Sequence, residues 1–212
     1  KLNAATDLAA LEAAASLAHA TYMQEAAVIS KARQKAAPAL AKAITAAMQG
    51  LGMQGGQFEV KLSKLELAAA YGLEQAEFLV AGHSGSTPRP VGKVASGGEL
   101  SRIALAIAVT TSQLGQAQTL IFDEVDAGVG GAVAQTVGRL MRQLGKDRQV
   151  MAVTHLPQVA ACADQHLVVA KHSDKGGTAS AAVGSGSEGA SLPNGRAGNG
   201  RVTLRVEGTE VG

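Results

Sequence analysis

The chain is poor in aromatic residues and in cysteine. Its 212 residues include three Phe, two Tyr and no Trp, so alanine and small aliphatic side chains must fill any core. The single cysteine, Cys162, excludes an intrachain disulfide and an all-cysteine zinc site, and it fits a reducing cytoplasm. No apolar run reaches the roughly 18 residues that a membrane span needs, so we expect no contact with a membrane.

A phosphate-binding loop is also missing. The pattern GxxxxGK[ST] does not occur, and the pair Gly92–Lys93 lacks both the loop and the following Ser or Thr. Because that loop cradles the phosphates of a nucleotide, we expect this chain alone not to hold ATP tightly. The sequence starts at Lys1 without a Met or a signal peptide, and we expect it to be a piece of a longer protein. A net charge of +2 does not by itself indicate nucleic-acid binding.

Residues 1–50 are predicted to form one long helix, since they are rich in Ala and contain no Gly before Gly50. Apolar residues on a 3-4 spacing predict a partner helix, as in the returning arm of an antiparallel coiled coil. An ordinary amphipathic helix on a globular core is the alternative. Pro38 is predicted to kink or break the helix near residues 35–37.

Residues 51–212 are predicted to form an α/β lobe with a mostly parallel sheet flanked by helices. The predicted strands cover residues 57–62, 76–81, 118–126, 148–155, 165–172 and 201–207. The predicted helices cover residues 98–114 and 131–144, with a short one from residue 156. The Gly- and Ser-rich residues 173–200 are predicted to be a flexible insertion, the tip of a hairpin between the last two strands.

The stretch "KVASGGELSR", residues 93–102, places Ser96, Gly97 and Gly98 at the start of a predicted helix. Adjacent glycines suit a place where backbone amides come very close to another group. A serine and free amides at a helix N-terminus suit an anion, of which phosphate is the usual one. The alternative is a plain turn with an N-cap, in which Glu99 only caps the helix. Arg102 either orients this helix or is a surface charge.

Polar residues end two neighbouring predicted strands. In "TLIFDEVD" the apolar run ends at Asp123 and Glu124, and "VMAVTH" ends with His155. In a parallel sheet such residues meet at the carboxyl edge, where ligands gather. An Asp there can hold Mg²⁺ through water, a Glu can orient an attacking water, and a histidine can contact the same phosphate. The alternatives are an acidic loop entry and a structural histidine.

The order of these motifs resembles the C-terminal half of an ATP-binding-cassette ATPase head. "ASGGE" (residues 95–99) looks like the signature motif, with Ala and Glu where Leu and Gln are commoner, and "LIFDE" (residues 120–124) looks like Walker B. "VDAGVGG" (residues 125–131) and His155 stand where the D-loop and the switch histidine belong. Residues 90–171 resemble more closely the RecN family, SMC-like ATPases of bacterial double-strand-break repair and recombination. The insertion at 173–200 departs from that family's short turn.

The resemblance implies that two heads dimerise around two ATP molecules. Ser96, Gly97, Gly98 and Glu99 would then face the γ-phosphate of ATP held by the second head, and Asp126 at the D-loop would couple the two sites. The Walker A half of the same protein would supply the phosphate loop. Other roles for the same fold stay open: a chromosome-structure SMC-type ATPase, or a dimerisation or DNA-binding module that does not hydrolyse ATP.

For the nucleotide of its own head, the resemblance implies that Asp123 holds Mg²⁺ through water and that Glu124 and His155 are catalytic. It also implies a bacterial, cytoplasmic, nucleoid-associated protein that binds DNA without sequence preference. A modest basic stretch on the predicted long helix is the candidate DNA surface, and a solvated helix face is the alternative. Its residues are Lys31, Arg33, Lys35 and Lys42.

Overall fold

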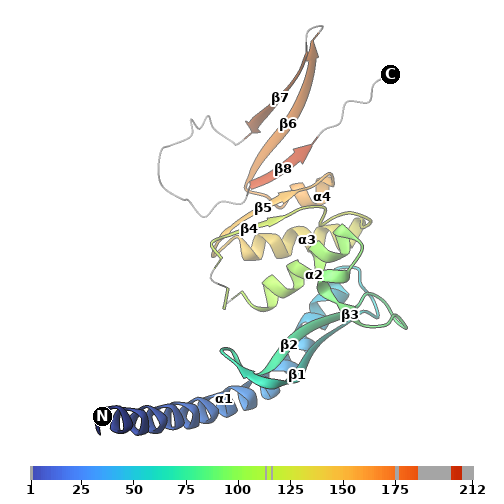
Figure 1. Ribbon diagram of the computed structural model, residues 1–212. Coiled ribbons are helices and arrows are strands. Elements are labelled where there is room, and N and C mark those ends of the chain that lie inside the picture. Colours follow the sequence, from blue (N-terminus) through green and yellow to red (C-terminus); the bar gives the residue numbers. More distant parts are fainter. Residues whose placement is uncertain (1, 113, 116, 175–176, 186–201, 207–212) are drawn as a thin grey trace.

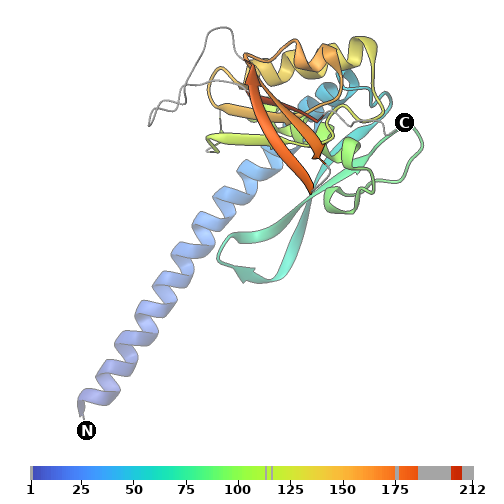
Figure 2. The same ribbon diagram turned by 90° about the horizontal axis from the view of Figure 1, so that it is seen from above.

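The computed structural model describes residues 2–112, 114, 115, 117–174, 177–185 and 202–206 (Figure 1). It begins with a single helix, α1 (Leu2–Gly50), whose N-terminal part projects away from the rest of the molecule (Figure 2). Of the kink or break predicted at Pro38, the break is wrong, because the helix runs through this residue. A proline costs its helix one hydrogen bond, and the following turns are held by packing, with Ile44 and Met48 completely buried.

A β-hairpin lies along α1. Strands β1 (Gln57–Ala69) and β2 (Gly72–Ala81) pair antiparallel, and the short strand β3 (Arg89–Pro90) adds to β2. Both long strands extend well beyond their predicted lengths toward the turn. Two side chains of α1 hold this turn: Tyr22 Oη donates to the Ala69 carbonyl at 2.8 Å, and Arg33 Nη2 donates to the Tyr71 carbonyl at 2.8 Å.

The rest of the chain follows the β1-β2-β3 sheet and begins with a 3-10 turn at Val91–Lys93. After this turn helices and strands alternate. Its helices are α2 (Gly97–Thr110), α3 (Gly131–Leu144) and α4 (Pro157–Ala160). Its strands are β4 (Thr119–Phe122), β5 (Gln149–Val153), β6 (Gln165–Asp174), β7 (Gly177–Ser185) and β8 (Val202–Val206). The sheet order is β4-β5-β8-β6-β7. In this sheet β4, β5, β8 and β6 pair in parallel and β7 is antiparallel. The predicted mostly parallel sheet is therefore found only in part, because the separate β1-β2-β3 sheet is antiparallel throughout.

The end of this sheet differs from the prediction. A hairpin between residues 165–172 and 201–207 is wrong, because β8 runs parallel to β6 and lies between β5 and β6. The hairpin partner of β6 is β7, which lies inside the predicted flexible insertion 173–200. The small Ala, Gly and Ser side chains of β7 suggest a loop, but backbone pairing with β6 makes them a strand. Residues 186–200 lie outside the described residues.

The core consists mainly of aliphatic side chains and methionine, and Phe58 and Phe122 are its buried aromatic members. It lies between the C-terminal part of α1, helices α2 and α3, and strands β4 and β5. Its largest fully buried apolar members are Ile44, Met48, Leu51, Ile103, Leu105, Val125, Val137 and Val159. Among the described residues, no helix has both the length and the hydropathy to cross a membrane. α2 and β4 run in opposite directions through this core, so the start of the helix lies beside the end of the strand.

Candidate nucleotide-binding site

Ser96 caps helix α2. Its backbone is extended, and its Oγ accepts a hydrogen bond from the Glu99 amide at 3.3 Å. The hydroxyl proton of Ser96 stays available for another acceptor. The amides of Gly97 and Gly98 belong to the first helical turn, where no carbonyl of the same helix can accept from them. The N-cap interpretation is therefore correct, and it leaves three donors that can hold an anion.

The two glycines pack against the loop that follows β4. A β-carbon on Gly97 would lie 2.5 Å from Glu124 Oε2, and one on Gly98 would lie 2.9 Å from the Ala127 β-carbon. The Gly98 position also lies 3.1 Å from the carbonyl oxygens of Glu124 and Ala127. The close approach that the glycine pair predicts is thus to the protein's own acidic loop.

Two further side chains of α2 bind the same loop. Ser101 Oγ donates to the Asp123 carbonyl, and Arg102 Nη1 donates to the Ala127 carbonyl at 2.7 Å. Arg102 is buried, so its alternative interpretation as a surface charge is wrong. Burial lowers the pKa of Arg102, and the negative charge of Glu99 acts in the opposite direction. Ser101 was not recognised in the sequence, where nothing separates it from an ordinary helical serine.

Asp123 and Glu124 are both exposed at the end of β4. Glu124 has a φ of 53°, in the left-handed region, and it is the one non-glycine residue with a positive φ in the described part of the chain. For an L-residue this costs about 1–2 kcal/mol, and such strain gathers at functional sites. The described residues contain no cluster of three or more metal-ligating side chains. A lone carboxylate such as that of Asp123 fits Mg²⁺, which takes most of its ligands from water and nucleotide phosphates.

Asp126 points into the protein, where its carboxylate binds the end of the next strand. Oδ2 accepts from the Thr154 hydroxyl and from the amides of His155 and Leu156, the latter two at 3.2 Å. Oδ1 lies 3.4 Å from His155 Nδ1. The His155 side chain is 66% exposed, whereas that of Asp126 is 1% exposed. The structure therefore brings Asp126 and His155 together.

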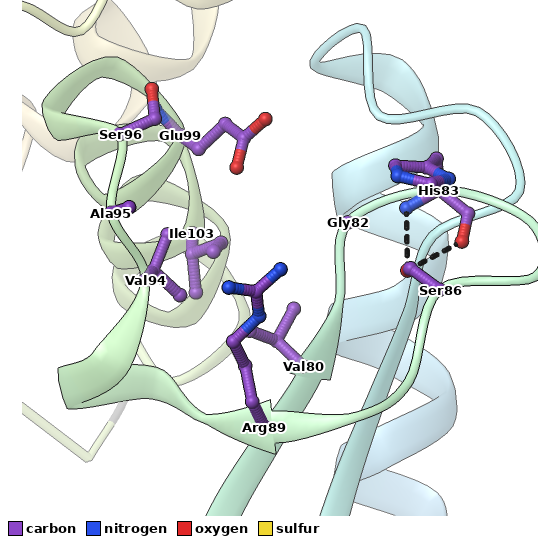
Figure 3. A pocket seen from close by; sticks show the side chains of 10 residues that line it. All are labelled: Val80, Gly82, His83, Ser86, Arg89, Val94, Ala95, Ser96, Glu99 and Ile103. Atoms are coloured by element: carbon purple, nitrogen blue, oxygen red, sulfur yellow. Dashed lines mark hydrogen bonds between the residues drawn. The ribbon is translucent and has the colours of Figure 1, made fainter.

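A pocket of about 160 Å³ opens between the start of α2 and the loop after β2 (Figure 3). Ser96 and Glu99 line it on the helix side, and the Arg89 side chain reaches into it from β3. The loop is held in shape by Ser86, whose hydroxyl donates to the His83 carbonyl at 2.7 Å. Arg89, His83 and Ser86 were missed in the sequence, where "GHSGSTPRP" reads only as a connecting loop.

Comparison with known proteins finds proteins of similar sequence and solved structures of similar fold. No model of a known protein family matches the chain. The DNA repair protein RecN of Xylella fastidiosa (strain Temecula1) is 47% identical over 152 residues, 71% of this chain and 27% of that protein. RecN of Vibrio cholerae is 41% identical over 172 residues, 81% of this chain and 31% of that protein. This chain thus spans less than a third of the length of these relatives.

Among solved structures, the Smc head domain from Pyrococcus furiosus, determined with an extended coiled coil and bound to the C-terminal domain of ScpA, is similar in fold. The superposition covers 81% of this chain and 40% of the Smc chain, with 19% sequence identity and a TM-score of 0.54. The fold is therefore similar to that of part of an SMC head domain. On sequence, the chain is a relative of the bacterial DNA repair protein RecN, with 41 to 47% identity to these two members over most of its own length.

Proposed function

We propose that this chain is the C-terminal half of an SMC-like ATPase head that binds and hydrolyses ATP in bacterial double-strand-break repair and recombination. One observation carries the proposal. A single chain brings the capped start of α2, the acids after β4 and the histidine after β5 to one edge of the sheet. The similarity to RecN repair proteins and the SMC head fold support it.

Each group at this edge has a chemical role in the proposal. The Ser96 hydroxyl and the amides of Gly97 and Gly98 donate to the γ-phosphate of ATP held by a second head, next to Glu99. Asp123 holds Mg²⁺ through water, and the ion supplies charge neutralisation at the phosphates. Glu124 orients the attacking water, and His155 contacts the phosphate.

A Walker A half is the first proposed partner. β4 stands at the end of the strand order in its sheet, and Ile121 on it is 69% exposed. In the described part of the chain no strand pairs with the outer edge of β4, and such an edge next to the candidate site can accept a strand from a polypeptide that supplies the phosphate loop. This edge supports the proposal that the two halves fold together and that two such heads then close on ATP.

DNA is the second proposed partner, bound along α1. Lys31, Lys35 and Lys42 are exposed, and their spacing places them within roughly 40° of one another around the helix. No acidic residue occurs between Ala26 and Gly50. Arg33 does not contribute to this basic stripe (Lys31, Lys35 and Lys42), because its guanidinium binds the β1–β2 turn. Contacts of this kind go to phosphates and carry no sequence preference.

ATP hydrolysis by this chain, combined with the Walker A half, tests the proposal. Activity should require both halves and should disappear in Glu124→Gln, while ATP-dependent dimers persist. Glu66→Gln is the matched control, because it makes the same change on an exposed glutamate of the β-hairpin. A folded mixture that binds ATP but does not hydrolyse it would exclude the hydrolase and favour a dimerisation or DNA-binding module.

A further inference from the structure

The two carboxylate oxygens of Asp126 differ in their hydrogen bonding. Oδ2 receives three donors, from the Thr154 hydroxyl and two backbone amides. Oδ1 is buried and has no hydrogen-bond partner in the described part of the chain. Because a buried, unpaired carboxylate oxygen is costly, this atom has a strong preference for a nearby donor or cation.

The imidazole of His155 is placed to provide that donor. Its Nδ1 lies 3.4 Å from Oδ1, slightly beyond hydrogen-bond length, and its ring is mostly exposed. The backbone of His155 is already fixed, since its amide donates to Oδ2 of the same carboxylate. Only a small rotation of the ring therefore separates the observed contact from a charge-assisted hydrogen bond, and such bonds tighten when an active site is filled.

We propose that Asp126 is a positioning residue for His155. Its Oδ1 accepts the proton on Nδ1, which leaves Nε2 as the ring nitrogen that faces outward toward the nucleotide. The neutral ring then offers Nε2 as an acceptor, and the charged ring offers it as a donor. This inference rests on the proposed ATPase function and adds to it the residue that determines which nitrogen of His155 meets the substrate.

The position of Asp126 in the chain gives this arrangement a further consequence. It lies three residues after Asp123, on the loop that Arg102 and Gly98 hold against α2. A shift of that loop would therefore move the Mg²⁺-binding carboxylate and the orientation of His155 together. The orientation of His155 would then change with the loop even if no residue of β5 contacted the nucleotide.

The tautomer of His155 can be measured without nucleotide. In the chain labelled with ¹⁵N-histidine, the His155 ring is assigned by its loss in His155→Gln and recorded where it is neutral. We expect the proton on Nδ1 in the wild-type chain and a mixture of tautomers in Asp126→Asn. Thr154→Val is the matched control: it removes one donor to Oδ2 without touching Oδ1, so the tautomer should stay on Nδ1.

A second measurement links the contact to turnover. In the chain combined with the Walker A half, Asp126→Asn should lower kcat while KM changes little, by about the 10- to 100-fold found for carboxylates that orient metal-bound histidines. A wild-type ring with its proton on Nε2, or equal tautomer changes in Asp126→Asn and Thr154→Val, would overturn the inference. If the wild-type mixture hydrolyses no ATP, the proposed function fails, but the tautomer in the wild-type chain still decides the role of Asp126, even if Asp126→Asn does not fold.

Discussion

Gly98 lies so close to Ala127 that a β-carbon on it would sit 2.9 Å from the Ala127 β-carbon. The contact joins the first turn of α2 to the loop after β4, and it is reinforced by the hydrogen bond from Arg102 to the Ala127 carbonyl. Because densely packed groups shift together rather than deform separately, we expect the start of α2 and the loop after β4 to behave as one unit.

Gly98→Ala should destabilise the chain by about 1–3 kcal/mol, the usual cost of overpacking a tight contact. Its neighbours are backbone oxygens and a β-carbon, none of which can rotate away. Urea unfolding of the variant and the wild-type chain measures the loss of unfolding free energy. Gly92→Ala is the control, because nothing lies within 4 Å of the β-carbon it adds. Equal stability of both variants would show that α2 and the loop are not tightly packed.

Gly97→Ala should behave differently. The atom in its way is Glu124 Oε2, at the far end of an exposed and flexible side chain. We expect a change in unfolding free energy within about 0.5 kcal/mol, but a displaced carboxylate and therefore slower ATP hydrolysis in the mixture with the Walker A half. Loss of hydrolysis with normal urea unfolding supports a functional role for the approach of Gly97 to Glu124. Full activity would show that the Glu124 carboxylate need not lie where the structure places it.

The left-handed backbone at Glu124 predicts an unusual order of stability. A glycine normally makes a folded protein about 0.5–1 kcal/mol less stable than an alanine at the same position, because the unfolded chain is more flexible at a glycine. At a φ of 53° an alanine carries a strain of about 1–2 kcal/mol that glycine avoids. Glu124→Gly should therefore be as stable as Glu124→Ala or up to about 1.5 kcal/mol more stable, with both inactive. Thermal or urea unfolding measures the difference, and an alanine variant that is clearly the more stable would exclude the strained backbone.

Much of the lobe was predictable because its boundaries are marked in the sequence. α3 occupies residues 131–144 as predicted, since glycines stand at its start and just beyond its end. The start of α2 follows from Ser96 and the two glycines. β4 and β5 follow from short apolar runs that end in polar residues. The grouping of the acids with His155 then follows from the parallel sheet.

The parts that were not predictable depend on tertiary contacts. Nothing in "VDAG" distinguishes the buried Asp126 from the exposed Asp123, because only the fold places Thr154 beside one of them. The order of β7 and β8 depends on backbone pairing, which alternating side chains do not specify. The helix continues through Pro38 because residues after it are buried against the lobe, a contribution that local propensity does not contain.

Arg102→Met should destabilise the chain by about 1–3 kcal/mol, since it fills similar space but leaves the Ala127 carbonyl without its donor. Arg142→Met is the control, because Arg142 lies on the exposed face of α3. Glu99→Gln should also destabilise, by a smaller amount, because the Glu99 charge opposes the effect of burial on the pKa of Arg102. Urea unfolding of the three variants tests this order, and an Arg142 variant that loses as much as the Arg102 variant would contradict it.

The basic stripe on α1 gives the last prediction. Replacing Lys31, Lys35 and Lys42 together with Gln should weaken binding to duplex DNA similarly for all sequences, and should reduce the slope of log K against log salt by roughly 2–3. Lys61→Gln with Lys64→Gln is the control, since these exposed lysines lie on β1 rather than on the stripe. The stripe is surface-exposed, so stability should stay within about 0.5 kcal/mol of wild type. Fluorescence anisotropy at several salt concentrations measures the slope, and an unchanged slope in the triple variant would place DNA elsewhere on the molecule.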